Sequence, residues 1–219
     1  MKTEEEKFRP PVPEQKKQPA NNAAKHEKRE IKPTTKDKEI KISNLTFDEK
    51  LALGRVCDRS KDYGPAVYNE CVSKQMESLS KVKRVNVSNL TFDEKLALGR
   101  VCDGSKDYGP AAYNECVSKQ TESLSKVKRT NVSSLTFDEK LALGRACDGS
   151  KDYGPAVYNE CVSKQMESLS KVKRVNVSKL TFDEKLALGR VCDGSKDYGP
   201  AAYNECLQKQ ISSIIKNRR

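Results

Sequence analysis

The chain contains no tryptophan, a single histidine and no hydrophobic run of membrane-spanning length. A transmembrane helix needs about 20 consecutive apolar residues, so none is expected. The single histidine, His26, lies near the N-terminus, and a glycine-rich phosphate loop is also missing. The chain therefore lacks the residues and motifs that usually carry acid–base catalysis, metal binding and nucleotide binding. We therefore expect a protein that is not an enzyme and that needs no metal or cofactor.

Apolar residues are scarce as well. Hydrophobic residues make up 35% of the 219 residues and charged residues 33%. A small unit of such composition has little core material, and small domains short of core commonly depend on disulfides, metals or neighbouring units. The eight cysteines are the first candidates for the missing stability.

The dominant feature of the sequence is a 45-residue unit that occurs four times, at residues 40–84, 85–129, 130–174 and 175–219. A fixed period of this size means that one supersecondary unit accounts for most of the chain. The first and third copies share Pro-Ala-Val-Tyr, whereas the second and fourth share Pro-Ala-Ala-Tyr. The last duplication therefore copied a two-repeat block. Because the copies are recent, their identity does not mark positions under selection.

Residues 1–39 precede the repeats and differ from them in composition. They are rich in proline, lysine, glutamate and asparagine, and they hold no apolar segment typical of a secretory signal. We expect a disordered basic tail.

Each repeat reads as two helices joined by a sharp turn. In the first copy, Thr46 and Glu49 form a capping box that starts a helix, and Phe47, Leu51 and residues 53–57 supply apolar residues at partly helical spacing. A short loop then leads to Gly64, after which a proline at the first helical position starts the second helix.

The expected unit is an antiparallel αα-hairpin. The β-branched and polar segment 85–90 predicts an extended connector to the next hairpin. Whether the hairpins stack into a solenoid or stay separate is not decided by the sequence.

Every repeat contains two cysteines 14 positions apart, each seven residues from the glycine of the turn in the first copy. Residues equidistant from the turn of an antiparallel hairpin face each other. Their Cα atoms then lie close enough for a disulfide, which needs a Cα–Cα separation of roughly 4.4–6.8 Å. A bridge closing such a loop stabilises its unit by about 3 kcal/mol. We predict four intra-repeat disulfides; free buried thiols or zinc shared between repeats are the alternatives. The pairs are Cys57/Cys71, Cys102/Cys116, Cys147/Cys161 and Cys192/Cys206.

Two tyrosines flank the Gly-Pro turn in each repeat. In the first copy we expect one of Tyr63 and Tyr68 to pack in the hairpin core, with the other as a candidate binding anchor. Four equivalent tips form a multivalent surface for a protein or a surface polymer. The candidate binding tips are Tyr63, Tyr108, Tyr153 and Tyr198.

The net charge of +11 is spread among closely alternating acidic and basic residues. Such alternation is typical of a solvated surface, whereas nucleic-acid binders usually gather positive charge on one face. Nucleic acid is therefore a disfavoured partner. The Lys-Val-Lys-Arg clusters at 81–84, 126–129 and 171–174 support a weaker alternative, a basic scaffold for nucleic acid or anionic surfaces.

The string from Gly109 to Cys116, GPAAYNEC, follows Leu-Thr-Phe-Asp-Glu and a first cysteine. It resembles a bacterial cysteine-pair helical-hairpin module with a GPAAYN-x-C core, found in exported proteins. The resemblance covers residues 45–80 and their three counterparts. It implies a hairpin fold, a periplasmic or extracellular setting and no catalytic residue.

The sequence as a whole predicts an all-α tandem array of four αα-hairpins after a disordered tail. We expect a non-enzymatic, multivalent binding or spacer array. Because the chain shows no export signal, the main alternative is a cytoplasmic thiol protein that is redox-responsive or binds zinc through pooled cysteines. The partner and the oligomeric state are left open.

Overall fold

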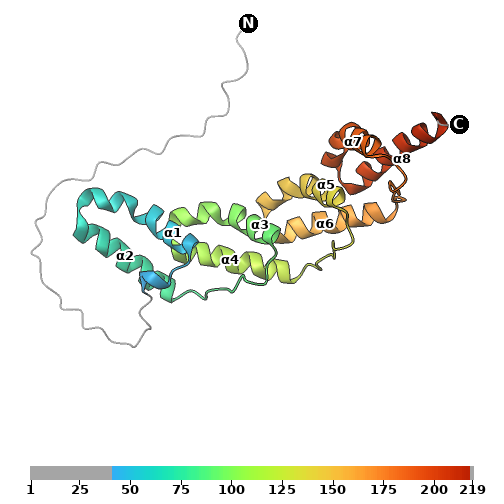
Figure 1. Cartoon of the computed structure of the whole chain (residues 1–219). Coiled ribbons are helices and arrows are strands. Elements are labelled where there is room, and N and C mark those ends of the chain that lie inside the picture. Colours follow the sequence, from blue (N-terminus) through green and yellow to red (C-terminus); the bar gives the residue numbers. More distant parts are fainter. Residues whose placement is uncertain (1–40, 218–219) are drawn as a thin grey trace, which may run out of the picture. The chain divides into compact units, whose positions relative to one another are not determined.

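The computed structural model describes residues 41–217, so the tail predicted at 1–39 lies outside the described residues. The described part is all-α, and each repeat contributes two α-helices with a 3-10 helix between them (Figure 1). A further short 3-10 helix, η1, covers Ile42–Asn44. The four repeats hold α1 (Phe47–Cys57), η2 (Asp58–Tyr63) and α2 (Pro65–Ser80); α3 (Phe92–Cys102), η3 (Asp103–Tyr108) and α4 (Pro110–Ser125); α5 (Phe137–Cys147), η4 (Asp148–Tyr153) and α6 (Pro155–Ser170); and α7 (Phe182–Val191), η5 (Asp193–Tyr198) and α8 (Pro200–Asn217).

The helix boundaries follow from local chemistry. The Thr46 hydroxyl accepts a hydrogen bond from the Glu49 backbone N–H, and the Glu49 carboxylate accepts one from the Thr46 N–H at 2.8 Å. This predicted capping box is confirmed in all four repeats. At the turn, Gly64 has a φ of 96°, a region that favours glycine, and Pro65 occupies the first position of α2. The stretch before Gly64 is a 3-10 helix where the sequence predicted a loop.

Each hairpin closes over a small apolar cluster. In the first repeat, Leu45, Leu53, Cys57, Val72 and Leu79 are buried together. The connector after the first hairpin is non-helical, as predicted, and its residues Val85, Val87 and Leu90 pack against the core of the second repeat. The connector therefore adds core material to a unit that has little of its own.

Phe47 and Leu51 of the first helix lie outside this core. Phe47 was grouped with Leu51 and residues 53–57 as part of the apolar pattern, yet its side chain is 79% exposed. Buried positions of α1 are Glu49, Ala52, Leu53 and Cys57, which define the helix face toward the core. Phe47 does not share that face, so the apolar residues at partly helical spacing in this helix are not all buried.

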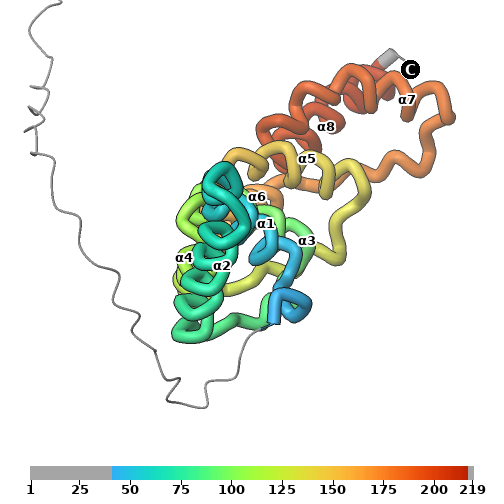
Figure 2. Tube along the Cα trace, turned by 90° about the vertical axis from the view of Figure 1, so that its left-hand side faces the viewer, coloured from blue at the N-terminus to red at the C-terminus, as the bar shows by residue number. Residues whose placement is uncertain are grey.

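The hairpins stack, which answers the question that the sequence left open. The second helices α2, α4, α6 and α8 contact one another in order, and α1, α3 and α5 each pack on the 3-10 helix and the second helix of the following repeat (Figures 1 and 2). Ala52 of α1 has no exposed surface because it joins the apolar cluster of the second repeat, beside Leu98 and Tyr113. Each internal interface is therefore a continuation of a hairpin core.

Polar contacts also cross each interface. At the first one, the Lys106 ammonium lies 2.8 Å from the Asp48 carboxylate, and the Asn114 amide donates a hydrogen bond of 2.9 Å to Glu49. Arg55 lies 3.3 Å from the carboxylate of Asp103. The same three contacts recur at the next two interfaces, as Lys151–Asp93, Asn159–Glu94 and Arg100–Asp148, and as Lys196–Asp138, Asn204–Glu139 and Arg145–Asp193.

Candidate binding surface

The two tyrosines of each turn separate as the sequence predicted. Tyr113, Tyr158 and Tyr203 are buried and Tyr68 is half-buried, whereas Tyr63 is 77% exposed at the end of η2. Its equivalents Tyr108, Tyr153 and Tyr198 are exposed to a similar degree. The exposed tyrosines are thus accessible at the end of each 3-10 helix, and their role as binding tips stays a prediction.

A second exposed aromatic occurs in each repeat, and the sequence reasoning missed it. Phe47, Phe92, Phe137 and Phe182 each stand at the first position of a helix with about four fifths of the side chain exposed. Aromatic side chains dominate the energetics of protein interfaces when a partner buries them. Four of them recur along the chain, one on each first helix.

Phe47 belongs to a continuous outer face of α1. Leu51 lies one turn further on, and positions four apart on a helix share a face. A shallow groove next to Leu51 is lined by Leu51, Gly54 and five charged residues, Lys50, Arg55, Asp58, Lys61 and Asp107. An added Cβ at Gly54 meets no atom within 4 Å, so the glycine keeps this stretch of surface low and open.

The fourth repeat carries the equivalent groove. Its lining includes Leu186, Gly189 and Arg190, at the positions of Leu51, Gly54 and Arg55. We call Phe47, Leu51 and Gly54, with their counterparts Phe92, Leu96 and Gly99, Phe137, Leu141 and Gly144, and Phe182, Leu186 and Gly189, the Phe–Leu face.

The helical spacing contains a signal that could have located the Phe–Leu face. Glu49, Ala52, Leu53 and Cys57 form one stripe, and Phe47 and Leu51 fall outside it. The signal was hidden because a glutamate occupies a core position while a phenylalanine occupies an exposed one. Hydrophobicity alone would therefore place Glu49 on the exposed side of the helix and Phe47 on the buried side, the reverse of what the structure shows.

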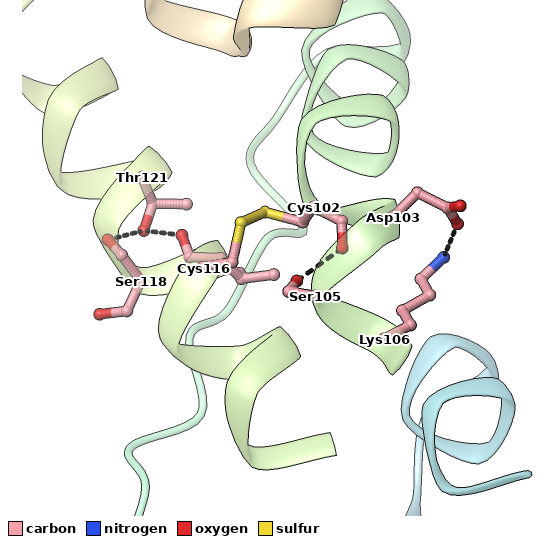
Figure 3. The surroundings of a disulfide bond; sticks show 8 residues. Cys102, Asp103, Ser105, Lys106, Cys116, Ser118 and Thr121 are labelled. Carbon is pink, nitrogen blue, oxygen red and sulfur yellow. Dashed lines mark hydrogen bonds and ion pairs between the residues drawn. A yellow bond between two sulfur atoms is a disulfide. The ribbon is translucent and has the colours of Figure 1, made fainter. Parts of the chain in front are cut away.

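The predicted cysteine pairs form disulfides within each repeat. Figure 3 shows the bridge between Cys102 on α3 and Cys116 on α4, with the Ser105 hydroxyl donating to the Cys102 carbonyl. No cysteine among residues 41–217 is free. The bridges tie the two helices of each hairpin beside the core. The Cα atoms are 5.8 Å apart in Cys57–Cys71, Cys102–Cys116 and Cys147–Cys161, and 5.7 Å apart in Cys192–Cys206.

The third bridge differs from the alternative of buried free thiols in two respects. Cys161 is bonded to Cys147, and it is only half-buried, whereas Cys147 has no exposed surface. The Cys161 Sγ also lies 3.9 Å from the Ala146 carbonyl oxygen, a separation at which a free thiol could donate a weak hydrogen bond. Because a disulfide sulfur carries no proton, this contact is van der Waals packing, and Cys161 acts as a bridge residue and not as a thiol.

Glu49 has a structural role beyond the capping box. Burial raises the pKa of its carboxyl, but hydrogen bonds from Arg84, the Thr46 N–H and Asn114 outweigh burial and lower the pKa below its ordinary value of 4.5. The pKa of Glu94 is lowered in the same way, by Thr91, Asn159 and Arg129 against burial. These carboxylates therefore stay charged in the folded protein and hold two repeats together.

Arg84 comes from the first Lys-Val-Lys-Arg cluster, which the sequence offered as part of a basic stripe. Its guanidinium instead pairs with the buried carboxylate of Glu49 in the same repeat. Arg129 and Arg174 pair with Glu94 and Glu139 in the same manner. One residue of each cluster is therefore engaged in holding its own hairpin.

Burial also determines the state of the inner tyrosines. Burial first, and then the nearby Asp138 carboxylate, raise the pKa of Tyr203 to about 12. The ammonium of Lys196 lies 5.1 Å from the centre of the Tyr203 ring. This tyrosine is a neutral packing residue at the interface between the third and fourth repeats.

Between residues 41 and 217, no three histidine, cysteine, aspartate or glutamate side chains gather closely enough to hold a metal ion. Across the same residues, no helix has both the length and the apolar character needed to cross a bilayer. Comparison of the chain with protein-family models, with curated proteins and with solved structures finds no match. The likeness to the bacterial hairpin module is therefore carried by the GPAAYN-x-C motif alone.

Proposed function

We propose that the protein is a multivalent protein-binding array in which each hairpin presents its Phe–Leu face. The observation that carries the proposal is the exposure of Phe47 and its three counterparts, each one helical turn before a leucine that is itself partly exposed. A spacer needs only a solvated surface, whereas an exposed aromatic next to a leucine and an arginine has the composition of a protein interface.

The arrangement favours a protein partner over nucleic acid. Arg84, Arg129 and Arg174 are paired with buried carboxylates, and Arg55 faces Asp103 and Asp107 across the interface. Arg55 and Lys61, which line the groove, therefore have acidic neighbours, and Leu51 and Gly54 give the groove an apolar part. A partner segment that buries an aromatic and an aliphatic anchor fits this surface.

The test is a selection with graded variants of the full chain. A peptide library displayed on phage is panned on the oxidised protein, and the enriched peptides are then measured on variants of the full chain, including one in which all four exposed phenylalanines are replaced by serine. We expect the selected peptide to bind the unmodified chain at up to four sites. Each single Phe→Ser substitution should remove one site without changing thermal stability, because an exposed side chain contributes little to folding.

Two matched variants make the test specific. Phe8→Ser changes the one phenylalanine outside the repeats and should leave binding unchanged. Replacing Tyr63, Tyr108, Tyr153 and Tyr198 by serine removes the other exposed aromatics. If only this tyrosine variant loses the peptide, the tips carry binding and the Phe–Leu face does not. If no peptide is enriched, the spacer alternative is favoured.

We further propose that the array works outside the cytoplasm, in a periplasmic or extracellular setting. Disulfides persist in oxidising compartments, and four hairpins with small cores depend on them. The competing proposal is a cytoplasmic thiol protein. Intact mass after alkylation without reductant, with a zinc assay on the same native sample, separates the two. Four disulfides and no zinc agree with our proposal, whereas eight alkylated thiols or bound zinc contradict it.

A further inference from the structure

The three internal interfaces are built from the same two surfaces. The forward face of a repeat contacts the repeat that follows, and in the first repeat it consists of Asp48, Glu49, Ala52, Arg55 and Gln75. The receiving face contacts the repeat that precedes. In the second repeat it consists of Asp103, Lys106, Asp107, Gly109 and Asn114.

The fourth repeat keeps every residue of the forward face. These residues are Asp183, Glu184, Ala187, Arg190 and Gln210. Ala52, Ala97 and Ala142 have no exposed surface because each enters the next core, whereas Ala187 is exposed. Asp183 is exposed too, whereas Asp48, Asp93 and Asp138 are half-buried. The forward face of the fourth repeat is therefore open among the described residues.

The first repeat keeps every residue of the receiving face. These residues are Asp58, Lys61, Asp62, Gly64 and Asn69. Lys106 is only 5% exposed in the second repeat, but Lys61 is exposed, and Asn69 is exposed where Asn114 is buried. Tyr68 is half-buried where Tyr113 is buried. Within residues 41–217, this receiving face is uncovered as well.

We propose that chains associate head to tail, with the forward face of the fourth repeat of one copy docked on the receiving face of the first repeat of the next. The contact is the internal interface made a fourth time. Asp183 pairs with Lys61, Arg190 with Asp58 and Asp62, and Ala187 enters the apolar cluster around Cys57 and Val72. The occupant is therefore a second copy of this chain, because the residues named above as making the internal contacts recur on both open faces.

The one difference within the loop of the receiving face does not oppose docking. Arg59 replaces the glycine found at position 104 in the second repeat. An added Cβ at Gly104 meets no atom within 4 Å, even though the first repeat is docked beside it. A side chain at this position therefore starts into open space and leaves the interface intact.

Such a contact joins two different surfaces and leaves one of each open after every addition. A heterologous contact of this kind extends into open assemblies unless its rotation closes a ring. Association is consequently not limited to a dimer, and it strings together further Phe–Leu faces. The inference does not depend on those faces binding a partner.

The experiment is sedimentation velocity of the oxidised full chain over a wide concentration range. We expect the weight-average mass to rise with concentration above that of one chain. Lys61→Glu places a negative charge opposite Asp183, and Asp183→Lys places a positive charge opposite Lys61, so each variant alone should be monomeric. Both positions are exposed in the single chain, and the thermal midpoint of each variant should stay unchanged.

Mixing the two variants distinguishes this contact from any other self-association. In an equimolar mixture, the intact forward face of the Lys61→Glu chain fits the intact receiving face of the Asp183→Lys chain, and the two substituted faces carry opposite charges as well, so the mixture should associate although each variant alone is monomeric. The double variant restores opposite charges and should associate again. Lys50→Glu makes the same charge change in the first repeat outside the receiving face and should associate like the unmodified chain.

The proposal is overturned if the unmodified chain is monomeric at every concentration. It is equally overturned if association survives both single substitutions, or if the mixture of the two variants stays monomeric.

Discussion

The interfaces inside the array and the two faces at its ends hold the same residues in opposite environments. Asn114 is buried against Glu49, whereas Asn69, its counterpart in the first repeat, is exposed. Lys106 is buried between Asp48 and Asp103, whereas Lys61 is exposed beside Asp58. The chain thus contains its own control for the energetic effect of stacking, because one substitution can be made at an inner copy and at an end copy.

The largest expected difference concerns the disulfides. Replacing Cys192 and Cys206 by alanine removes about 3 kcal/mol from a repeat that has a neighbour on one side only. Replacing Cys102 and Cys116 removes a similar amount from a repeat that is braced on both sides. Hydrogen exchange should show that residues 182–217 lose protection when Cys192 and Cys206 are replaced. The second repeat should stay protected when Cys102 and Cys116 are replaced.

Equal loss of protection in the two disulfide variants would mean that neighbouring repeats do not brace one another. The stacking contacts would then add nothing to the stability of a single hairpin.

The next difference separates an inner asparagine from an end one. Asn114→Ala removes the amide that hydrogen-bonds the buried Glu49 carboxylate, and it should lower the free energy of unfolding by about 1–3 kcal/mol. Asn69→Ala makes the same change on an exposed surface and should alter it by about 0.5 kcal/mol or less. Urea unfolding of dilute, monomeric protein measures both, and equal effects would contradict a buried role for Asn114.

Acid should weaken the inner interfaces. The pKa values of Glu49 and Glu94 are lowered in the folded chain, because hydrogen bonds to the charged form outweigh burial. A lowered folded-state pKa gives stability that is fully present above the unfolded value, near pH 4.5, and is lost as the pH falls through the folded value.

The thermal midpoint of the unmodified chain should therefore fall steeply below about pH 4.5. A variant with Glu49→Gln and Glu94→Gln should start from a lower midpoint at pH 7 and show a shallower fall. An unchanged slope in that variant would show that these two carboxylates do not cause the acid sensitivity.

The smallest expected difference concerns the glycine of the turn. Gly64 and Gly109 both have φ near 100°, so an alanine at either position should cost about 1–3 kcal/mol. At Gly109 the added Cβ also meets the side-chain amide of Gln75 from the preceding repeat. Moving that flexible side chain should cost about 0.5–1 kcal/mol more. A comparison of the thermal midpoints of the Gly64→Ala and Gly109→Ala variants measures the extra loss. Equal midpoints would contradict a contact between Gln75 and Gly109.

Local signals in the sequence predicted most of the hairpin. The capping box, the Gly-Pro turn and the cysteine spacing each act over few residues, and all three are confirmed. The sequence could not reveal the stacking, because its contacts join residues far apart. Glu49 reaches Arg84 at a separation of 35 residues and Asn114 at 65. Read locally, Glu49 is a capping residue only, and its burial depends on a neighbour that local patterns do not place.

The sequence did not predict the Phe–Leu face for a related reason. The sequence pattern lists Phe47 only as one of several apolar residues at partly helical spacing, and burial is the usual state of a phenylalanine. The buried face of α1 is instead narrow and includes Glu49 and Ala52. The following repeat covers Ala52. Only the packing of the next hairpin shows which side of the helix remains open.

The central claim is that the hairpins are joined by specific side-chain contacts, and a double-mutant cycle on Glu49 and Asn114 tests it most directly. The free energy of unfolding is measured for the unmodified chain, for Glu49→Ala, for Asn114→Ala and for the double variant. We expect an interaction energy of about 1 kcal/mol or more, because the amide donates to a buried carboxylate. Additive effects, within about 0.3–0.5 kcal/mol, would contradict stacking and describe four independent hairpins on a string.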